Sequence, residues 1–208
     1  MEEQMLFHKY QVFALQRHVE QQAKEAVRGL PEERLDEDDE RLTSETVEQF
    51  TPAVPTIDPS QIYQTDRQIQ LDARLMPNRM FLNRVRPVPV PGTEITIHVP
   101  FNGDPTMFDV CPSSHTTTWP FGTIDAENSE VLLTYRTADI NFPVKARYEE
   151  TLRDIRQYLE WLNADMPKFA SLRQVVRSEL AKRRQAASTH SKLAASTGVP
   201  RRPDRHAS

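Results

Sequence analysis

The clearest pattern of hydrophobic and polar positions lies between Val144 and about Ala187. Hydrophobic residues recur there at alternating steps of four and three, which places them on one side of an α-helix and approaches a coiled-coil heptad. These residues are Tyr148, Leu152, Ile155, Leu159, Leu162, Met166 and Phe169. The pattern predicts a long C-terminal helix over residues 143–187, and Pro167 predicts a kink near its own position. A single narrow apolar stripe requires another element to cover it, and we expect a second helix to do so.

The N-terminal region contains the first candidate for that second helix. A helix is predicted over residues 1–29, and its apolar stripe begins with Leu6, Tyr10 and Phe13. Gly29 followed by Pro31 is a typical helix end, because glycine suits the residue after the last turn and proline cannot continue the helix. A weaker helical pattern continues beyond Pro31, so we interpret residues 1–50 as an N-terminal helical region.

The middle of the chain predicts strands. Prolines are dense in residues 51–68, which indicates a proline-rich linker with an extended backbone. From residue 94 to residue 101, large apolar residues alternate with polar residues or proline, as in a strand with one buried face. Short strands and turns extend over residues 69–137, which we interpret as a small antiparallel β unit. The predicted fold class is therefore α+β: N- and C-terminal helices form a stalk, and the β unit is inserted between them.

Charge is distributed unevenly along the 208 residues, although the formal net charge is only −4. Residues 25–50 contain ten acidic and three basic residues, whereas residues 173–208 contain nine basic and two acidic residues. This polarity can steer self-association or attract a charged partner. The alternative interpretation is a pair of solvated helix faces followed by a disordered basic tail over residues 188–208.

Cysteine content and hydropathy indicate a cellular location. Cys111 is the only cysteine, so the chain cannot form an intramolecular disulfide. The N-terminus carries no hydrophobic signal, and no apolar run approaches the roughly 20 residues needed to span a bilayer. We therefore expect a cytoplasmic protein without a membrane partner.

Residues with chemically reactive side chains are densest between His98 and His115. The set comprises His98, Asp104, Asp109, Cys111 and His115. A Cys111–His115 pair could act as a thiolate–imidazole nucleophile or contribute to a zinc site. However, Pro112 separates the pair and no other cysteine completes a four-ligand site, so a small buried cysteine is the preferred interpretation. The chain also lacks a glycine-rich dinucleotide motif and a Walker motif. We expect no catalytic residues, cofactor or metal site, and the protein is not predicted to be an enzyme.

Basic residues near the C-terminus form a second candidate site. They are Lys182, Arg183, Arg184, Arg201 and Arg202. Such a tail can contact nucleic-acid phosphates with little sequence preference. It can equally serve as a solubilising, disordered end of the chain.

Several short motifs resemble a recurring region of poorly characterised bacterial proteins. They are a turn at Pro100-Phe101-Asn102-Gly103-Asp104, then Cys111-Pro112-Ser113, Tyr158-Leu159-Glu160-Trp161-Leu162, Lys182-Arg183-Arg184 and Thr197-Gly198-Val199-Pro200-Arg201-Arg202. In that group the region is often found beside effector domains of the Toll/interleukin-receptor or nuclease type, in systems suspected of acting against phage. The resemblance implies an accessory, sensing or assembly region. Because this chain stops soon after Arg205, it implies that an effector would be a separate chain or be absent.

The predicted function is therefore protein–protein interaction, with a second copy of the chain or a separate effector as the partner. The residues expected to carry it are Leu6, Tyr10, Phe13, Tyr148, Leu152, Ile155, Leu159, Leu162 and Met166, with Trp161 as an outward anchor. A nucleic-acid-contacting subunit is the first alternative, and an enzyme that uses Cys111 is the second.

Overall fold

The structure is a computed structural model that describes residues 3–75 and 88–196. It divides into two compact units. The sheet unit lies within residues 1–15 and 52–166, and the helical unit lies within residues 16–51 and 167–208. Helix α1 (Val12–Arg28) begins in the first unit and continues into the second. The chain is thus a mixed α and β protein with an antiparallel sheet, as the sequence predicts.

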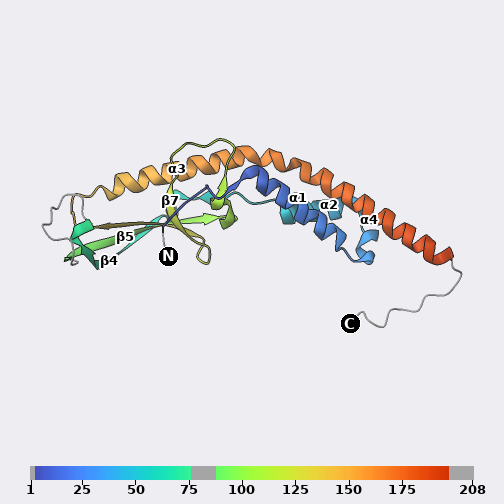
Figure 1. Ribbon diagram of the computed structural model, residues 1–208, viewed down its shortest axis with the longest axis horizontal. Helices are drawn as coiled ribbons and strands as arrows, with labels where there is room; N and C mark the ends of the chain where they lie inside the picture. Colours follow the sequence, from blue (N-terminus) through green and yellow to red (C-terminus); the bar gives the residue numbers. More distant parts are fainter. Residues whose placement is uncertain (1–2, 76–87, 197–208) are drawn as a thin grey trace, which may run out of the picture. The chain divides into compact units, whose positions relative to one another are not determined.

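The main sheet is built around one long strand, β5 (Pro89–Asn102). On one side β5 pairs with β8 (Glu130–Thr137), and the order continues through β7 (Phe121–Asp125) to β1 (Gln4–Met5). On its other side β5 pairs with β4 (Tyr63–Asp72) and with β3 (Thr56–Ile57), and all these pairings are antiparallel. Ile97, Val99 and Phe101 are buried, so the alternation in the sequence does mark one covered face. Figure 1 shows β4 and β5 side by side in this unit.

Strand β4 begins six residues before the first predicted strand residue, Ile69. The region predicted as a linker contains β3, a 3-10 turn at Pro59–Gln61 and the first half of β4. Residues 63–68 are all exposed and almost all polar, because β4 is an edge strand and neither of its faces is covered there. A strand of this kind lacks the apolar alternation by which strands are recognised.

The N-terminal residues do not form the predicted helix. Gln4–Met5 form β1, Tyr10–Gln11 form β2, and β2 pairs in parallel with β6 (Val110–Cys111). Between the two short strands, Leu6 donates its backbone N–H to Pro120 O and Lys9 donates to Asp109 O, each at 2.9 Å. Phe7 adopts a φ of +59°, which a helix does not allow. The helix therefore starts only at Val12, because the preceding N–H groups already bond to the loop after β5.

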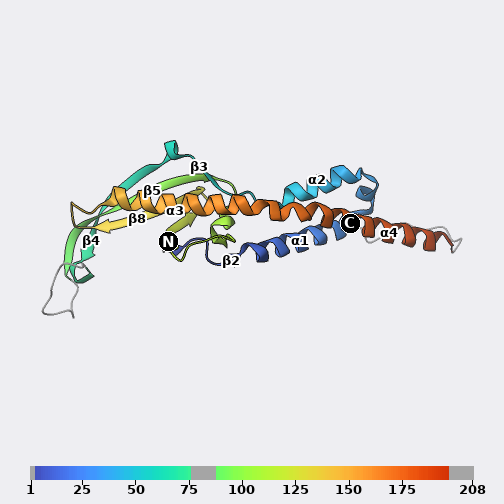
Figure 2. The same ribbon diagram turned by 90° about the horizontal axis from the view of Figure 1, so that it is seen from above.

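Helix α3 (Val144–Asp165) belongs to the sheet unit and lies alongside the sheet in both views (Figures 1 and 2). Its residues Leu152, Ile155, Leu159 and Leu162 are buried within the single chain. Tyr158, outside the predicted stripe, is also buried and stacks on Phe7 with ring centroids 5.0 Å apart. The prediction that a second helix covers this segment is wrong. The N-terminal segment that contains the short strands and the loop before β7 contact α3 instead.

The α-helix is interrupted at the predicted position. It ends at Asp165, and 3-10 turns span Met166–Ala170 around Pro167. Helix α4 then runs over Ser171–Ser196 in the helical unit. The predicted disordered tail from residue 188 is therefore helical as far as Ser196, because the alanine-rich sequence before Gly198 contains no helix breaker.

The helical unit packs α1 from Gln16, a 3-10 turn at Glu32–Asp36 and α2 (Asp39–Phe50) with α4. Its buried apolar residues are Val19, Ala23, Val27, Leu35, Leu42, Phe169, Leu172, Val176 and Leu180. Asp38 caps α2 by accepting the Arg41 N–H at 2.9 Å. Figure 2 shows α1 and α2 beside α4 in this unit.

Candidate functional site

The chemical residues that are dense in the sequence do not converge on one site. Asp104 caps a 3-10 turn at Pro105–Asp109 by accepting the Thr106 N–H at 2.9 Å. Asp109 forms an ion pair with Lys9 at 2.9 Å. His98 lies on β5 and forms its hydrogen bonds with neighbouring strands. Among the described residues, no group of three or more acidic, histidine or cysteine side chains is arranged to hold a metal ion.

Cys111 is a buried thiol with only 1% of its surface exposed. Burial raises the pKa of the thiol above its ordinary value, and the charge of Asp165 raises the pKa further. The Cys111 Sγ lies 3.6 Å from His115 Nδ1, so the predicted pair is adjacent. A thiol that is buried and has a raised pKa remains protonated near neutral pH, which disfavours a thiolate nucleophile.

The loop after Cys111 is held against α3 by polar contacts that have no pattern in the sequence. Asp165 accepts the Ser113 backbone N–H at 2.7 Å and the Ser113 hydroxyl at 2.5 Å. The Tyr158 hydroxyl donates to Thr118 O at 3.0 Å. A helix carboxylate and a buried tyrosine therefore fix this loop, and their role is structural.

The outer face of the sheet carries a hydrogen-bonded chain of four side chains from three adjacent strands. His98 Nδ1 lies 2.8 Å from Glu130 Oε2, and His98 Nε2 lies 3.0 Å from Thr65 Oγ1. Tyr63 stacks on the imidazole with ring centroids 4.4 Å apart and donates its hydroxyl to Glu130 Oε1 at 2.7 Å. Of this cluster only His98 was a candidate from the sequence, because the four residues are brought together only by the β4–β5–β8 register.

A second polar cluster lies on the same strands. Glu94 is 7% exposed and binds Arg67 at 2.6 Å and Arg136 at 2.7 Å. These two guanidinium groups, Arg67 first, hold the pKa of Glu94 below its ordinary value. The carboxylate therefore links the edge strand β4 to β8 across β5.

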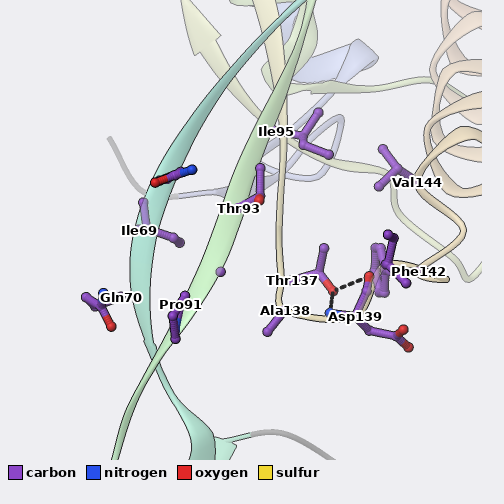
Figure 3. A pocket seen from close by; sticks show the side chains of 13 residues that line it. Ile69, Gln70, Pro91, Thr93, Ile95, Thr137, Ala138, Asp139, Phe142 and Val144 are labelled. Atoms are coloured by element: carbon purple, nitrogen blue, oxygen red, sulfur yellow. Dashed lines mark hydrogen bonds between the residues drawn. The ribbon is translucent and has the colours of Figure 1, made fainter.

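At one end of the sheet unit a groove of about 600 Å³ opens beside the first residue of α3. Ile69, Thr93 and Ile95 line it from the strands, and the loop from Thr137 to Val144 lines it from the opposite side (Figure 3). Ile140 of this loop is 98% exposed. The groove thus combines a lining of mixed apolar and polar residues with a fully exposed aliphatic side chain, which was not among the predicted interaction residues.

Most of the predicted interaction residues are core residues of this chain. Leu6, Leu152, Ile155, Leu159 and Leu162 are buried, which leaves them no surface for a partner. Tyr148, Trp161 and Met166 are half-buried, and Trp161 packs edge-on against Tyr158 with centroids 5.1 Å apart. Tyr10 and Phe13 are exposed, at 59% and 50%.

The basic residues of α4 lie close to the acidic segment of the helical unit. Arg184 binds Asp39 at 2.6 Å and the backbone carbonyl of Glu37 at 2.5 Å. Lys182 lies 3.4 Å from Glu179, and Arg183 is half-buried. Arg201 and Arg202 lie outside the described residues. Three arginines of α4, Arg173, Arg177 and Arg184, are therefore paired with Glu40 and Asp39 of the acidic segment.

Across residues 3–75 and 88–196, no helix is both long enough and apolar enough to cross a membrane. No family model, curated protein or solved structure matches this chain.

Proposed function

We propose that this protein is a non-catalytic interaction subunit that assembles through the groove at the end of the sheet unit. The function is the one expected from the sequence, but the surface is different. The apolar stripe of α3 is already buried by its own chain, so an interface must use side chains that remain exposed. Ile140, at 98% exposure, is the observation that carries the proposal.

An exposed isoleucine beside a groove that contains other aliphatic side chains is a source of binding energy. Burial of one such side chain contributes about 1.5–3 kcal/mol. The groove contains Ile69, Ile95 and Val144, and its volume of about 600 Å³ exceeds that of one aliphatic side chain. A partner that fills the groove would cover apolar surface that otherwise contacts water.

A second copy of the chain is the partner that fits this surface. A two-fold interface requires one patch to be complementary to itself. Here the protruding Ile140 and the groove belong to the same patch, so each copy can insert its isoleucine into the other. Charge is also complementary, because Asp139 lies on the groove while Lys145 and Arg147 lie on the first turn of α3.

The resemblance of its motifs supports a further part of the proposal, an accessory or sensing role in a bacterial anti-phage system with the effector on a separate chain. In that arrangement the assembled copies would present several docking sites to one effector. The nucleic-acid alternative has less support, because Arg184 is paired with Asp39 and Lys182 lies near Glu179.

Light scattering after size exclusion tests the proposal. The wild-type chain should elute as a dimer, and Ile140→Asp should weaken association by at least tenfold, since it removes one buried isoleucine from each copy. Leu193→Asp is the matched control, because Leu193 is an exposed aliphatic residue of α4, 71% accessible, that is not among the residues lining the groove. A wild-type monomer that retains no partner on purification would contradict the proposal, and so would equal dispersal by both substitutions.

A further inference from the structure

We propose that Thr65 is an activated surface hydroxyl that accepts an acyl group from activated esters or thioesters. The inference rests on the side-chain cluster on the outer face of the sheet and is independent of the assembly role. Thr65 Oγ1, the His98 imidazole and the Glu130 carboxylate are joined in series by contacts of 3.0 Å and 2.8 Å. A hydroxyl, an imidazole and a carboxylate in this order form a nucleophile, its base and the group that orients the base.

The carboxylate determines the direction of the hydrogen bonds. A carboxylate only accepts, so Nδ1 of His98 carries the proton that is donated to Glu130. In the neutral imidazole the other nitrogen, Nε2, is then an acceptor, and the hydroxyl of Thr65 is its donor. The base thus already accepts a hydrogen bond from the hydroxyl whose proton must leave when the Thr65 oxygen attacks.

The three side chains of the series differ in solvent exposure, and the nucleophile is the most exposed, as this chemistry requires. Thr65 is exposed on the edge strand β4, whereas the side chains of His98 and Glu130 are only 17% and 12% exposed. Tyr63 covers one face of the imidazole and binds the second oxygen of Glu130 at 2.7 Å. The nucleophile is therefore open to a reactant while its base and the orienting carboxylate are held in place.

The reaction joins Thr65 to the acyl carbon. The Oγ1 of Thr65 forms a bond to the carbonyl carbon of the donor as its proton passes to His98 Nε2. The bond from that carbon to the alkoxide or thiolate then breaks, and the departing group takes the proton from His98. The products are an O-acylated Thr65, a free alcohol or thiol and a neutral imidazole.

The surroundings of the site define the class of donor. None of Thr65, His98 and Glu130 lines the groove of Figure 3, and the three lie on the open outer face of the sheet. The site therefore offers proton transfer at a hydroxyl that is exposed to solvent. Donors with a good leaving group, such as aryl esters and acyl thioesters, match this arrangement because they need little further activation.

A matched control lies on the same face of the sheet. Thr96 is hydrogen-bonded to Thr134, with the two hydroxyl oxygens 3.3 Å apart. Thr96 is one strand away from Thr65, in the Cα register position directly opposite it. The two threonines share one face of the sheet, but Thr65 is exposed on the edge strand whereas Thr96 is half-buried on β5 and bonds to another threonine in place of an imidazole.

The test uses the full chain and 4-nitrophenyl acetate, with peptide mass spectrometry as the readout. Thr65 should be acetylated on the order of a hundredfold faster in the wild-type chain than in folded His98→Asn protein, because general-base assistance contributes about 10²–10⁴-fold. Thr65→Val should abolish the labelled peptide. His98→Asn and Glu130→Gln should each slow labelling of Thr65, while Thr96→Val should leave its rate unchanged.

The ratio of acetylation at Thr65 to that at exposed lysines in the unaltered chain gives a second measurement that does not depend on how the variants fold. Labelling confined to lysines and the N-terminal amine would overturn the inference. So would labelling of Thr65 at the same rate in folded His98→Asn protein, because the hydroxyl would then react without its base.

Discussion

Helices α3 and α4 follow each other in the chain, yet they are held in their units by different contacts. In the sheet unit, Tyr158 of α3 stacks on Phe7 and binds the loop before β7, and the ion pairs of α3 itself are long, at 3.7–3.9 Å. In the helical unit, α4 forms ion pairs with other elements, among them Glu179–Arg28 at 2.6 Å. Both helices bury an apolar stripe, but α3 is also held by an aromatic stack and α4 by an ion pair with another helix.

The largest expected effect is the loss of the aromatic anchor of α3. Tyr158→Ala should destabilise the sheet unit by about 3–5 kcal/mol, because it removes a fully buried ring and leaves a cavity. Tyr158→Phe, the matched control, keeps the ring and should cost only about 1 kcal/mol for the lost hydroxyl bonds. Urea unfolding measures both changes. Similar losses for the two variants would mean that the hydroxyl, and not the ring, anchors the helix.

A smaller, pH-dependent effect is expected from the charged anchor of α4. Arg28 holds the pKa of Glu179 below its ordinary value, mainly through their hydrogen bond. Because the folded-state pKa is lowered, the pair stabilises the fold above about pH 4.5, and this contribution is lost as the pH falls through the folded-state pKa. Glu179→Gln should cost about 1 kcal/mol at neutral pH, since Arg28 is 58% exposed and partly screened.

The control for this prediction is Glu149→Gln on α3, where the carboxylate lies 3.9 Å from Lys145 and is mostly exposed. Unfolding free energies measured from pH 7 to pH 3 should converge for Glu179→Gln and wild type as the pH falls. A difference that stays constant across this range would assign the effect to packing of the side chain and not to its charge.

The smallest effect is expected at the surface of the helical unit. Glu40 pairs with both Arg173 and Arg177 of α4, and all three side chains are about half exposed. Glu40→Gln should therefore lower stability by no more than about 1 kcal/mol at low ionic strength, and the difference should shrink in 1 M salt. A loss of stability that does not depend on salt would show that Glu40 contributes through side-chain packing and not through its charge.

The sequence predicts an element well where one face of it is buried and the other is solvated. Strand β5 and helix α3 meet this condition, so their periodicities are visible in Ile97 and Val99 and in Leu152 and Ile155. The first half of β4 does not meet it, because an exposed edge strand has no apolar face to alternate. The spacing of Leu6 and Tyr10 fits one helical face, but the Leu6 N–H bonds to Pro120 O and Tyr10 lies in a strand that pairs with β6.

The candidate sites show the same limit. Thr65, His98 and Glu130 are each separated by about 30 residues, so only the strand register brings them together. The uneven charge of the two sequence segments indicates that they can pair. It does not indicate which side chains form the ion pairs. Ile140 belongs to no apolar periodicity in the sequence, and its importance depends on the groove beside it, which the folded sheet creates.

The order of the segments has a consequence for synthesis of the protein. Residues 16–51 leave the ribosome early, whereas α4 follows only after the whole sheet unit has been made. At typical translation rates this delay is on the order of ten seconds. During that interval the apolar faces of α1 and α2 lack their cover, so the nascent chain is a natural substrate for chaperones until its last helix emerges.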